Sequence, residues 1–170
     1  MDLGSIKLRS GRGRERTVDE FTTLFDLCLV VLDARQPSCN RALLPVVERI
    51  DEVLSGADCI VGVLLVAADE DDVERALGSL AKQVAVFVDP DGEAATALGV
   101  SAAPALVWIT TAPEIGSVVQ GWDPLAWRGV LDRLAHKLAW TRPLLPQSGD
   151  PAPFPGRALN LESTRTRPGQ

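Results

Sequence analysis

Three cysteines are the residues of this chain best suited to covalent chemistry. Cys28, Cys39 and Cys59 form an odd set at wide spacing, which matches neither a disulfide framework nor a set of metal ligands. His136 is the only histidine, so no zinc site is expected. Reduced thiols are typical of cytosolic proteins. We therefore predict a cytoplasmic protein that holds no metal and no cofactor.

Cys39 differs from the other two cysteines in its surroundings. Cys28 and Cys59 lie in apolar, β-branched runs and are expected in the core. Cys39 precedes a segment with helical apolar spacing, so it lies near the start of a helix, where the helix dipole favours a thiolate. Cys39 is therefore a candidate nucleophile, and an inert small residue at the same position is the alternative. A disulfide from Cys39 to a core cysteine is disfavoured on distance.

Apolar runs and helically spaced segments alternate through the middle of the chain. Near-continuous apolar runs predict buried strands, and apolar residues repeating every three to four positions predict helices. The predicted strands cover residues 24–32, 59–67, 84–88, 105–111 and 116–120, and the predicted helices cover 41–54, 70–81, 93–98 and 125–140. This order of elements predicts an α/β sandwich around a mixed sheet.

The two ends of the chain differ in composition from its middle. The first 16 residues carry five basic side chains and three glycines, and residues 141–170 hold six prolines without apolar periodicity. Such compositions bury too little apolar surface to offset the entropy of ordering. We predict a disordered basic N-terminal arm over 1–16, a single domain over 17–144 and a disordered Pro-rich tail over 145–170.

Charge and hydropathy exclude two classes of partner. The net charge is −6, and an acidic body does not bind nucleic acid by releasing counterions. No apolar stretch reaches the length of about 18 residues that a membrane-spanning helix needs. We therefore expect neither nucleic acid nor membrane as a partner.

Two segments carry a resemblance to a known family. The run LGVSAAPALVWI, from Leu98 to Ile109, resembles the cis-proline segment of the thioredoxin superfamily, in which a short helix ends at glycine and a proline opens the next strand. The resemblance implies that Pro104 is the cis-proline. The run RALLP, from Arg41 to Pro45, is similar to the stretch that follows the second redox cysteine in thioredoxins and TlpA-type reductases.

The register of the second segment implies that the redox motif is degenerate. Counting back from Pro45 places Asn40 at the position of the second redox cysteine and Pro37 at that of the first, with Cys39 between them. Val31 takes the position of the buried acid that assists proton transfer in many thioredoxins. The resemblance thus implies a thioredoxin-like three-layer sandwich of the TlpA-like branch, with an extra strand-helix insertion and without the cysteine pair.

Two functions agree with this resemblance. The first is a client-binding or chaperone/maturation-type module, in which the groove beside the cis-proline binds an extended segment of a protein client by strand addition. The expected groove residues are Pro37, Asn40, Ala103, Pro104, Ala105 and Trp122, and for Trp122 packing inside the domain is the alternative. The alternative is a monothiol thioredoxin-like oxidoreductase with Cys39 as its catalytic nucleophile, forming a mixed disulfide with glutathione or a client.

Overall fold

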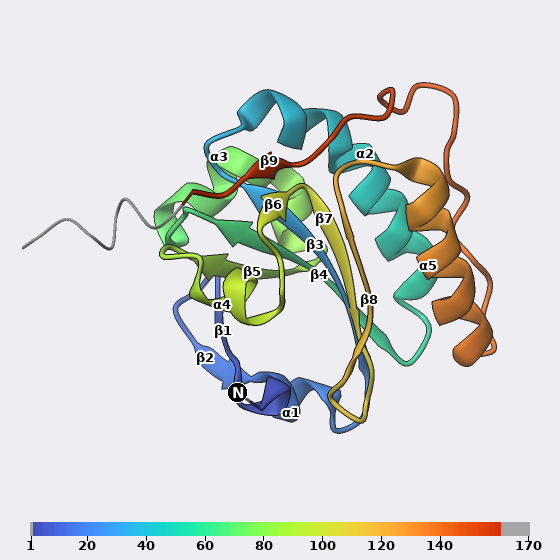
Figure 1. The fold of residues 1–170 in the computed structure, drawn as a ribbon, viewed down its shortest axis with the longest axis horizontal. Helices are drawn as coiled ribbons and strands as arrows, with labels where there is room; N and C mark the ends of the chain where they lie inside the picture. Colours follow the sequence, from blue (N-terminus) through green and yellow to red (C-terminus); the bar gives the residue numbers. More distant parts are fainter. Residues whose placement is uncertain (1, 161–170) are drawn as a thin grey trace, which may run out of the picture.

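Three parallel strands with almost wholly buried side chains form the centre of the sheet (Figure 1). They are β3 (Asp26–Asp33), β4 (Cys59–Val66) and β5 (Ala85–Asp89). Beyond β3 lie two antiparallel strands, β7 (Ala105–Ile109) and β8 (Ile115–Gln120). The computed structural model describes residues 2–160. These five strands match the predicted ranges to within two residues at each end, because long apolar runs specify buried strands directly.

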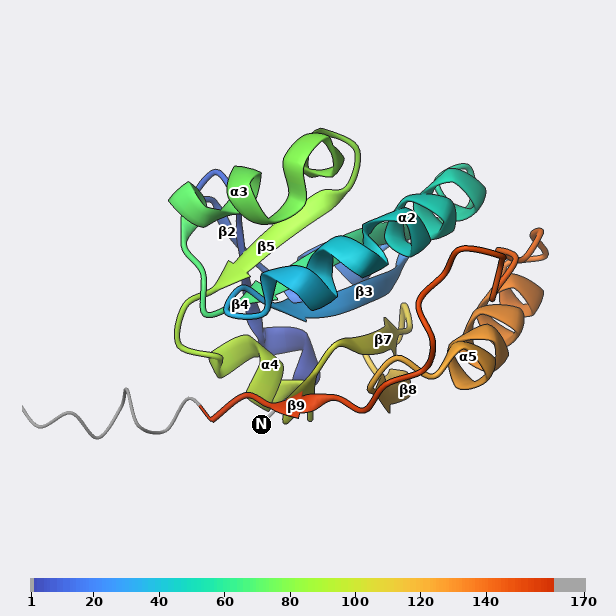
Figure 2. The same cartoon turned by 90° about the horizontal axis from the view of Figure 1, so that it is seen from above.

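Helices cover both faces of this sheet. One face packs against α2 (Pro37–Leu54), α3 (Val73–Leu77) and α5 (Pro124–Lys137), and the other against α1 (Val18–Thr22) and α4 (Glu93–Ala97). An apolar core lies on each face of the sheet, and alternate side chains of β3 point into the two cores, as the pleat requires. Val30 belongs to the core on the α2 face and Val31 to the core on the α4 face. Figure 2 shows α2 and α4 on opposite sides of the central strands. The predicted three-layer α/β sandwich with a mixed sheet is confirmed.

The predicted helix over 70–81 is broken into three short turns. They are η2 (Glu70–Asp72), α3 and η3 (Gly78–Lys82). Gly78 has φ +57°, a left-handed conformation that ends the α-helix there. Leu77 and Leu80 are nevertheless buried in the core, as their helical spacing predicted. This region and β5 form the insertion expected between β4 and the cis-proline segment.

The N-terminal residues are not a disordered arm, and that prediction is wrong. A short helix, η1 (Leu3–Ser5), leads into a hairpin of β1 (Lys7–Ser10) and β2 (Glu15–Thr17). β1 pairs antiparallel with β5, so the sheet order is β2-β1-β5-β4-β3-β7-β8. Ile6 and Leu8 are buried on the α4 face. Two apolar side chains and a row of ladder hydrogen bonds thus order a segment whose average composition is polar.

Residues 145–160 are ordered as well, contrary to the predicted tail. After α5 the chain returns across the molecule, and β9 (Arg157–Ala158) pairs with β6 (Ala102–Ala103) in a second, two-stranded sheet. Leu145 and Leu159 are buried, and Phe154 packs against the core. These anchors are spaced too widely to show a helical or strand period. We call residues 151–160 the C-terminal strap; residues 161–170 of the predicted tail lie outside the described residues.

Candidate functional site

The cis-proline segment lies between β6 and β7. The peptide bond Ala103–Pro104 is cis, which confirms the assignment of Pro104. The carbonyl oxygen of Pro104 accepts a hydrogen bond from the Gly121 N–H at 2.7 Å. Ala103, Pro104 and Ala105 are all buried, and Ala105 lies opposite Val31 in the ladder between β7 and β3. The side chains of these predicted groove residues therefore belong to the core. The backbone of Pro104 and Ala105 is also engaged within the domain, and that of Ala103 lies opposite Arg157.

The α2 helix begins at Pro37, four residues earlier than predicted. Proline suits the first helical position, where its φ is already helical and an N–H is not needed. Cys39 is the third residue of this helix, half-buried and unpaired. Asn40 is 3% exposed, and its Nδ2 donates to the Asp33 carbonyl oxygen at 2.8 Å. The amide of Asn40 thus ties the start of α2 to the end of β3.

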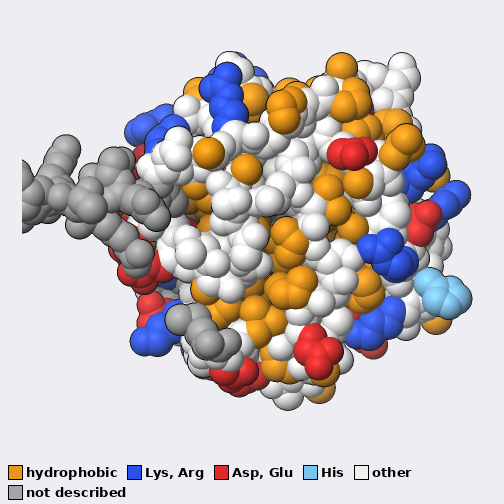
Figure 3. Space-filling model, viewed as in Figure 1, with side chains coloured by type: hydrophobic (Ala, Val, Ile, Leu, Met, Phe, Trp, Pro, Cys, Tyr) orange, Lys and Arg blue, Asp and Glu red, His pale blue; other side chains and the backbone are white. Residues whose placement is uncertain are grey.

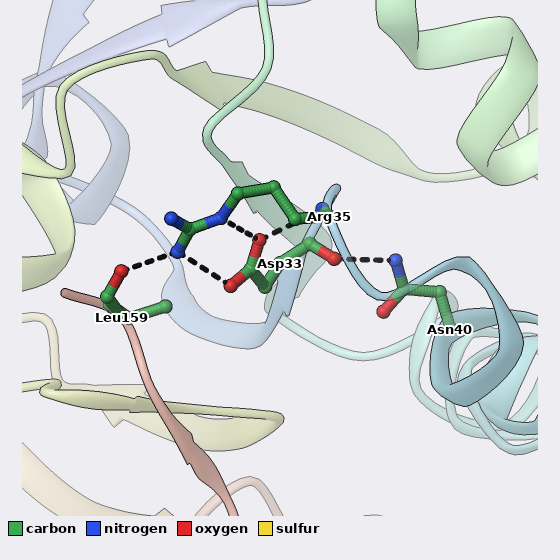
Figure 4. Close-up of polar contacts among 4 residues, drawn as sticks. All are labelled: Asp33, Arg35, Asn40 and Leu159. Carbon is green, nitrogen blue, oxygen red and sulfur yellow. Dashed lines mark hydrogen bonds and ion pairs between the residues drawn. The ribbon is translucent and has the colours of Figure 1, made fainter. Parts of the chain in front are cut away.

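Asp33 and Arg35 form a polar link in the loop between β3 and α2 (Figure 4). The buried carboxylate of Asp33 accepts hydrogen bonds from the Arg35 Nε at 2.9 Å and Nη2 at 2.8 Å. The Arg35 backbone N–H adds a third hydrogen bond at 2.9 Å. The side-chain hydrogen bond to Asp33 raises the pKa of Arg35 above its ordinary value. Arg35 Nη2 also donates to the Leu159 carbonyl oxygen, so this loop holds the C-terminal strap.

The strap pairs with the cis-proline segment along its backbone. Ala102 lies opposite Ala158, and Ala103 lies opposite Arg157. Next to this pair the Leu159 N–H donates to the Ser101 carbonyl at 2.9 Å. An extended segment of the chain itself therefore occupies the edge at which a client was expected.

A second backbone pairing holds the start of the strap. Trp122 and Phe154 exchange two hydrogen bonds, with N···O distances of 2.9 and 3.1 Å. Together with the pairing at Ala102, this bridge fixes the strap at two places along the edge of the domain.

Trp122 packs inside the protein, so the groove interpretation is wrong for this residue and the packing interpretation holds. Its side chain has 0% exposure, and its Nε1 donates to the Pro151 carbonyl oxygen at 2.8 Å. Its ring packs edge-on against Trp127, with ring centroids 4.9 Å apart. The strap covers Trp122, which the local sequence around the residue does not reveal.

The remaining predicted groove residues face a different space. Pro37 and Asn40 line a cavity of about 320 Å³ between the start of α2 and the α3 region. The rest of its lining is Ala34, Arg41, Leu44, Asp72, Arg75, Ala76 and Gly78. The predicted site is thus divided into two parts. The cis-proline edge, which consists of residues 101–103 and Trp122, lies under the strap. The start of α2 faces the cavity beside α3. Sequence reasoning missed Asp33 and Arg35, although an Asp-x-Arg run directly after a buried strand was a readable signal.

Comparison with solved structures places the fold. The thiol:disulfide interchange protein DsbE of Chlorobium tepidum is similar with a TM-score of 0.64 at 14% identity, over 81% of this chain and 95% of that one. The exposed lipoprotein thioredoxin Etrx1 of Streptococcus pneumoniae gives 0.58 at 19%, over 78% and 96% of the two chains. The fold is thioredoxin-like. A secreted disulfide oxidoreductase of Mycobacterium tuberculosis, homologous to DsbE of E. coli, gives 0.57 at 16%, over 79% and 95%.

Sequence comparison adds no family assignment. No protein-family model matches the chain, and no curated protein matches it. At these identities the solved neighbours show the fold alone. Within residues 2–160 no helix is long and apolar enough to cross a membrane. The cytoplasmic location stays a prediction, because the structures similar to this chain include a secreted protein and an exposed lipoprotein.

Proposed function

We propose that this protein is a thioredoxin-fold binding module without the redox cysteine pair, which binds an extended segment of a protein client along the cis-proline edge. The observation that carries the proposal is the antiparallel pairing of β6 with β9. This pairing is strand addition, in which main-chain hydrogen bonds supply affinity and side chains seated in pockets supply specificity. A segment from another chain in the same extended conformation would make the same hydrogen bonds.

The surroundings of the cysteines support a function that transfers no electrons. Disulfide exchange needs an attacking thiolate and a second thiol that resolves the mixed disulfide. Pro37 and Asn40 supply neither, and the Asn40 amide is engaged with β3. Burial raises the pKa of Cys59 to about 12 and raises that of Cys28 well above its ordinary value. Neither core cysteine can therefore serve as the resolving partner of Cys39.

The surface agrees with recognition through the backbone. On the face drawn in Figure 3, hydrophobic and uncharged side chains fill the middle, and charged side chains lie mainly around the rim. This face presents no continuous field of one sign that would select a strongly charged ligand. A client held by main-chain hydrogen bonds and a few apolar anchors fits such a surface.

Two assays on the full chain test the proposal. In the insulin reduction assay with dithiothreitol, the protein should give the same rate as buffer. Clients captured from the native host by wild type and by Cys39→Ser should be the same, and both should elute without reductant. Clients that are released only by reductant, and that Cys39→Ser fails to capture, would establish the monothiol oxidoreductase instead.

A further inference from the structure

The C-terminal strap makes the contacts that an added strand makes. The strap is held extended by three prolines, Pro151, Pro153 and Pro155. Proline fixes φ near −65° and has no N–H that could donate a hydrogen bond elsewhere. The N–H groups of Phe154 and Leu159 donate to the domain at both ends of the paired stretch. The strap is therefore shaped as a ligand for this edge.

Glycine at position 156 suits the close approach where the strap crosses the domain. A Cβ atom on Gly156 would lie 3.1 Å from the Ala102 Cβ and 3.1 Å from the Gly121 N. Gly121 has φ +89°, and a Cβ there would lie 3.0 Å from the Gly156 N. The two backbones thus approach so closely that a Cβ on either side would have to displace its neighbour by a few tenths of an ångström. A segment that follows this path is therefore expected to fit best with glycine at the same place.

Two apolar anchors flank this glycine. Phe154 packs against the core on the α2 face, and Leu159 is 4% exposed in the core on the α4 face. The strap thus passes around the end of the sheet from one face to the other, as Figure 2 shows for the segment running from α5 to β9 beside α4. Arg157 and Ala158 between the anchors are exposed. The strap residues that contact the domain most closely, Phe154, Gly156 and Leu159, follow the pattern Phe-x-Gly-x-x-Leu.

The strap is held more loosely than the domain core. The paired stretch β9 is two residues long. A groove of about 350 Å³ remains beside Pro153, Phe154 and Pro155, against Gln120 to Asp123. Segments with few buried contacts and short ladders open at a lower free energy than the whole fold.

We infer that the C-terminal strap is a resident, displaceable ligand of the cis-proline edge, and that the partner of this protein carries the same Phe-x-Gly-x-x-Leu pattern in an extended segment. The inference rests on the proposed function. The strap and the partner compete for one site, so the apparent affinity for a partner is reduced by the fraction of time that the strap is seated.

The test uses full-length protein and a fluorescein-labelled peptide with the sequence of residues 152–160, APFPGRALN. Gly156→Val unseats the strap, and by fluorescence polarisation this variant should bind the peptide at least about tenfold more tightly than wild type, as expected if the strap is seated nine-tenths of the time or more. Leu159→Asp is a second opening variant with the same expectation. A peptide with valine in place of its glycine should bind both variants more weakly than the glycine peptide does.

A disulfide lock supplies the opposite perturbation. Because the Leu159 N–H donates to the Ser101 carbonyl, the next pair, Ala102 and Ala158, is a non-hydrogen-bonded pair with a Cα separation of about 4.5 Å, which suits a disulfide. In a Cys39→Ser background, Ala102→Cys with Ala158→Cys should lose peptide binding when oxidised. Dithiothreitol should restore binding to the wild-type level.

The outcomes distinguish the inference about the strap from the proposed function. Equal peptide affinity in wild type and Gly156→Val, with binding lost in the oxidised lock, overturns the inference and leaves the proposed function standing, because the edge would then bind a segment without competition from the strap. Equal affinity in all three proteins, the oxidised lock included, would mean that the peptide binds away from this edge, and overturns both. Absence of binding to both opening variants, with their tryptophan emission shifted to the red as Trp122 meets water, overturns the proposed function and the inference with it. Circular dichroism confirms that each variant is folded.

Discussion

An ion pair between Arg49 and Asp150 clamps the segment that leads into the strap onto α2. Arg49 Nη1 and Nη2 donate to the two carboxylate oxygens of Asp150 at 3.0 and 2.8 Å. Arg49 Nη1 also donates to the Leu144 carbonyl at 3.2 Å, and the Gln147 N–H donates to Asp150 at 2.7 Å. The two charged side chains are only 16% and 4% exposed. Replacing Asp150 therefore breaks a nearly buried, two-point contact between distant parts of the chain.

We expect Asp150→Asn to lower the free energy of unfolding by about 2–4 kcal/mol. Removing one partner of a buried ion pair costs about 3–5 kcal/mol, and asparagine keeps one oxygen that can still accept a hydrogen bond. The matched control is Asp132→Asn, which breaks the exposed pair with Arg142 at 3.0 Å and should cost less than about 1 kcal/mol. Urea denaturation followed by tryptophan fluorescence measures both variants.

The same clamp predicts how stability changes in acid. The hydrogen bond from Arg49 lowers the pKa of Asp150 below its ordinary value of 3.8. A carboxyl group with a lower pKa in the folded state contributes stability that is complete above the unfolded pKa and is lost as the pH falls through the folded value. The difference between wild type and Asp150→Asn should therefore be constant near neutral pH and shrink below about pH 4.

Two results would refute this reasoning. One is an Asp150→Asn variant within about 0.5 kcal/mol of wild type at pH 7, the range of an ordinary surface substitution. The other is a difference between the two proteins that stays constant down to about pH 2, since the carboxylate would then contribute nothing that protonation removes.

Three further predictions concern the start of α2 and the cysteines. Asn40→Ala should lower the free energy of unfolding by about 1–2 kcal/mol, because the Asp33 carbonyl loses its amide donor. The control Ser38→Ala, at an exposed neighbouring position, should have no effect in the same urea experiment. Equal costs for the two variants would show that the hydrogen bond from the Asn40 amide contributes nothing. The double variant Pro37→Cys, Asn40→Cys should form a disulfide, seen as the loss of two thiols in an Ellman titration, and should raise insulin reduction above the buffer rate. If both new thiols stay free in oxidant, the assignment of these two positions to the redox cysteines is wrong. In the folded wild type an alkylating reagent near neutral pH should modify Cys39 alone, since the other two thiols are buried and have raised pKa values. Mass spectrometry counts the modified sites. Rapid modification of more than one site would contradict the burial of the core cysteines.

Much of the fold was readable from local sequence. Apolar runs such as Cys59–Val66 specify buried strands because every side chain in them must leave water, whichever helix covers it. The run from Leu98 to Ile109 likewise located the cis-proline, through its resemblance to the thioredoxin segment in which a proline opens a strand. These features depend on residues adjacent in the chain, so a short window contains the whole signal.

The candidate site was readable only in part. Pro37, Asn40 and Pro104 were identified by position, but the sequence did not show that the first two face α3 while the third lies under the strap. Trp122 follows a glycine beside the predicted groove, so its position left both a groove role and a packing role open. Its burial depends on Pro151, 29 residues later, which no local pattern around Trp122 predicts.

The sequence by itself determined the layered α/β architecture and the lack of cysteine at Pro37 and Asn40, because these follow from side chains and spacings within short segments, and its resemblance to thioredoxins implied the cis-proline. Only the tertiary structure decided that β1 completes the sheet beside β5, that Arg35 reaches Leu159, and that the strap covers the binding edge. Those contacts join residues that are distant in the chain. Their free energy comes from few apolar anchors and paired backbone groups, which exist only once the rest of the domain has folded and presents an open edge.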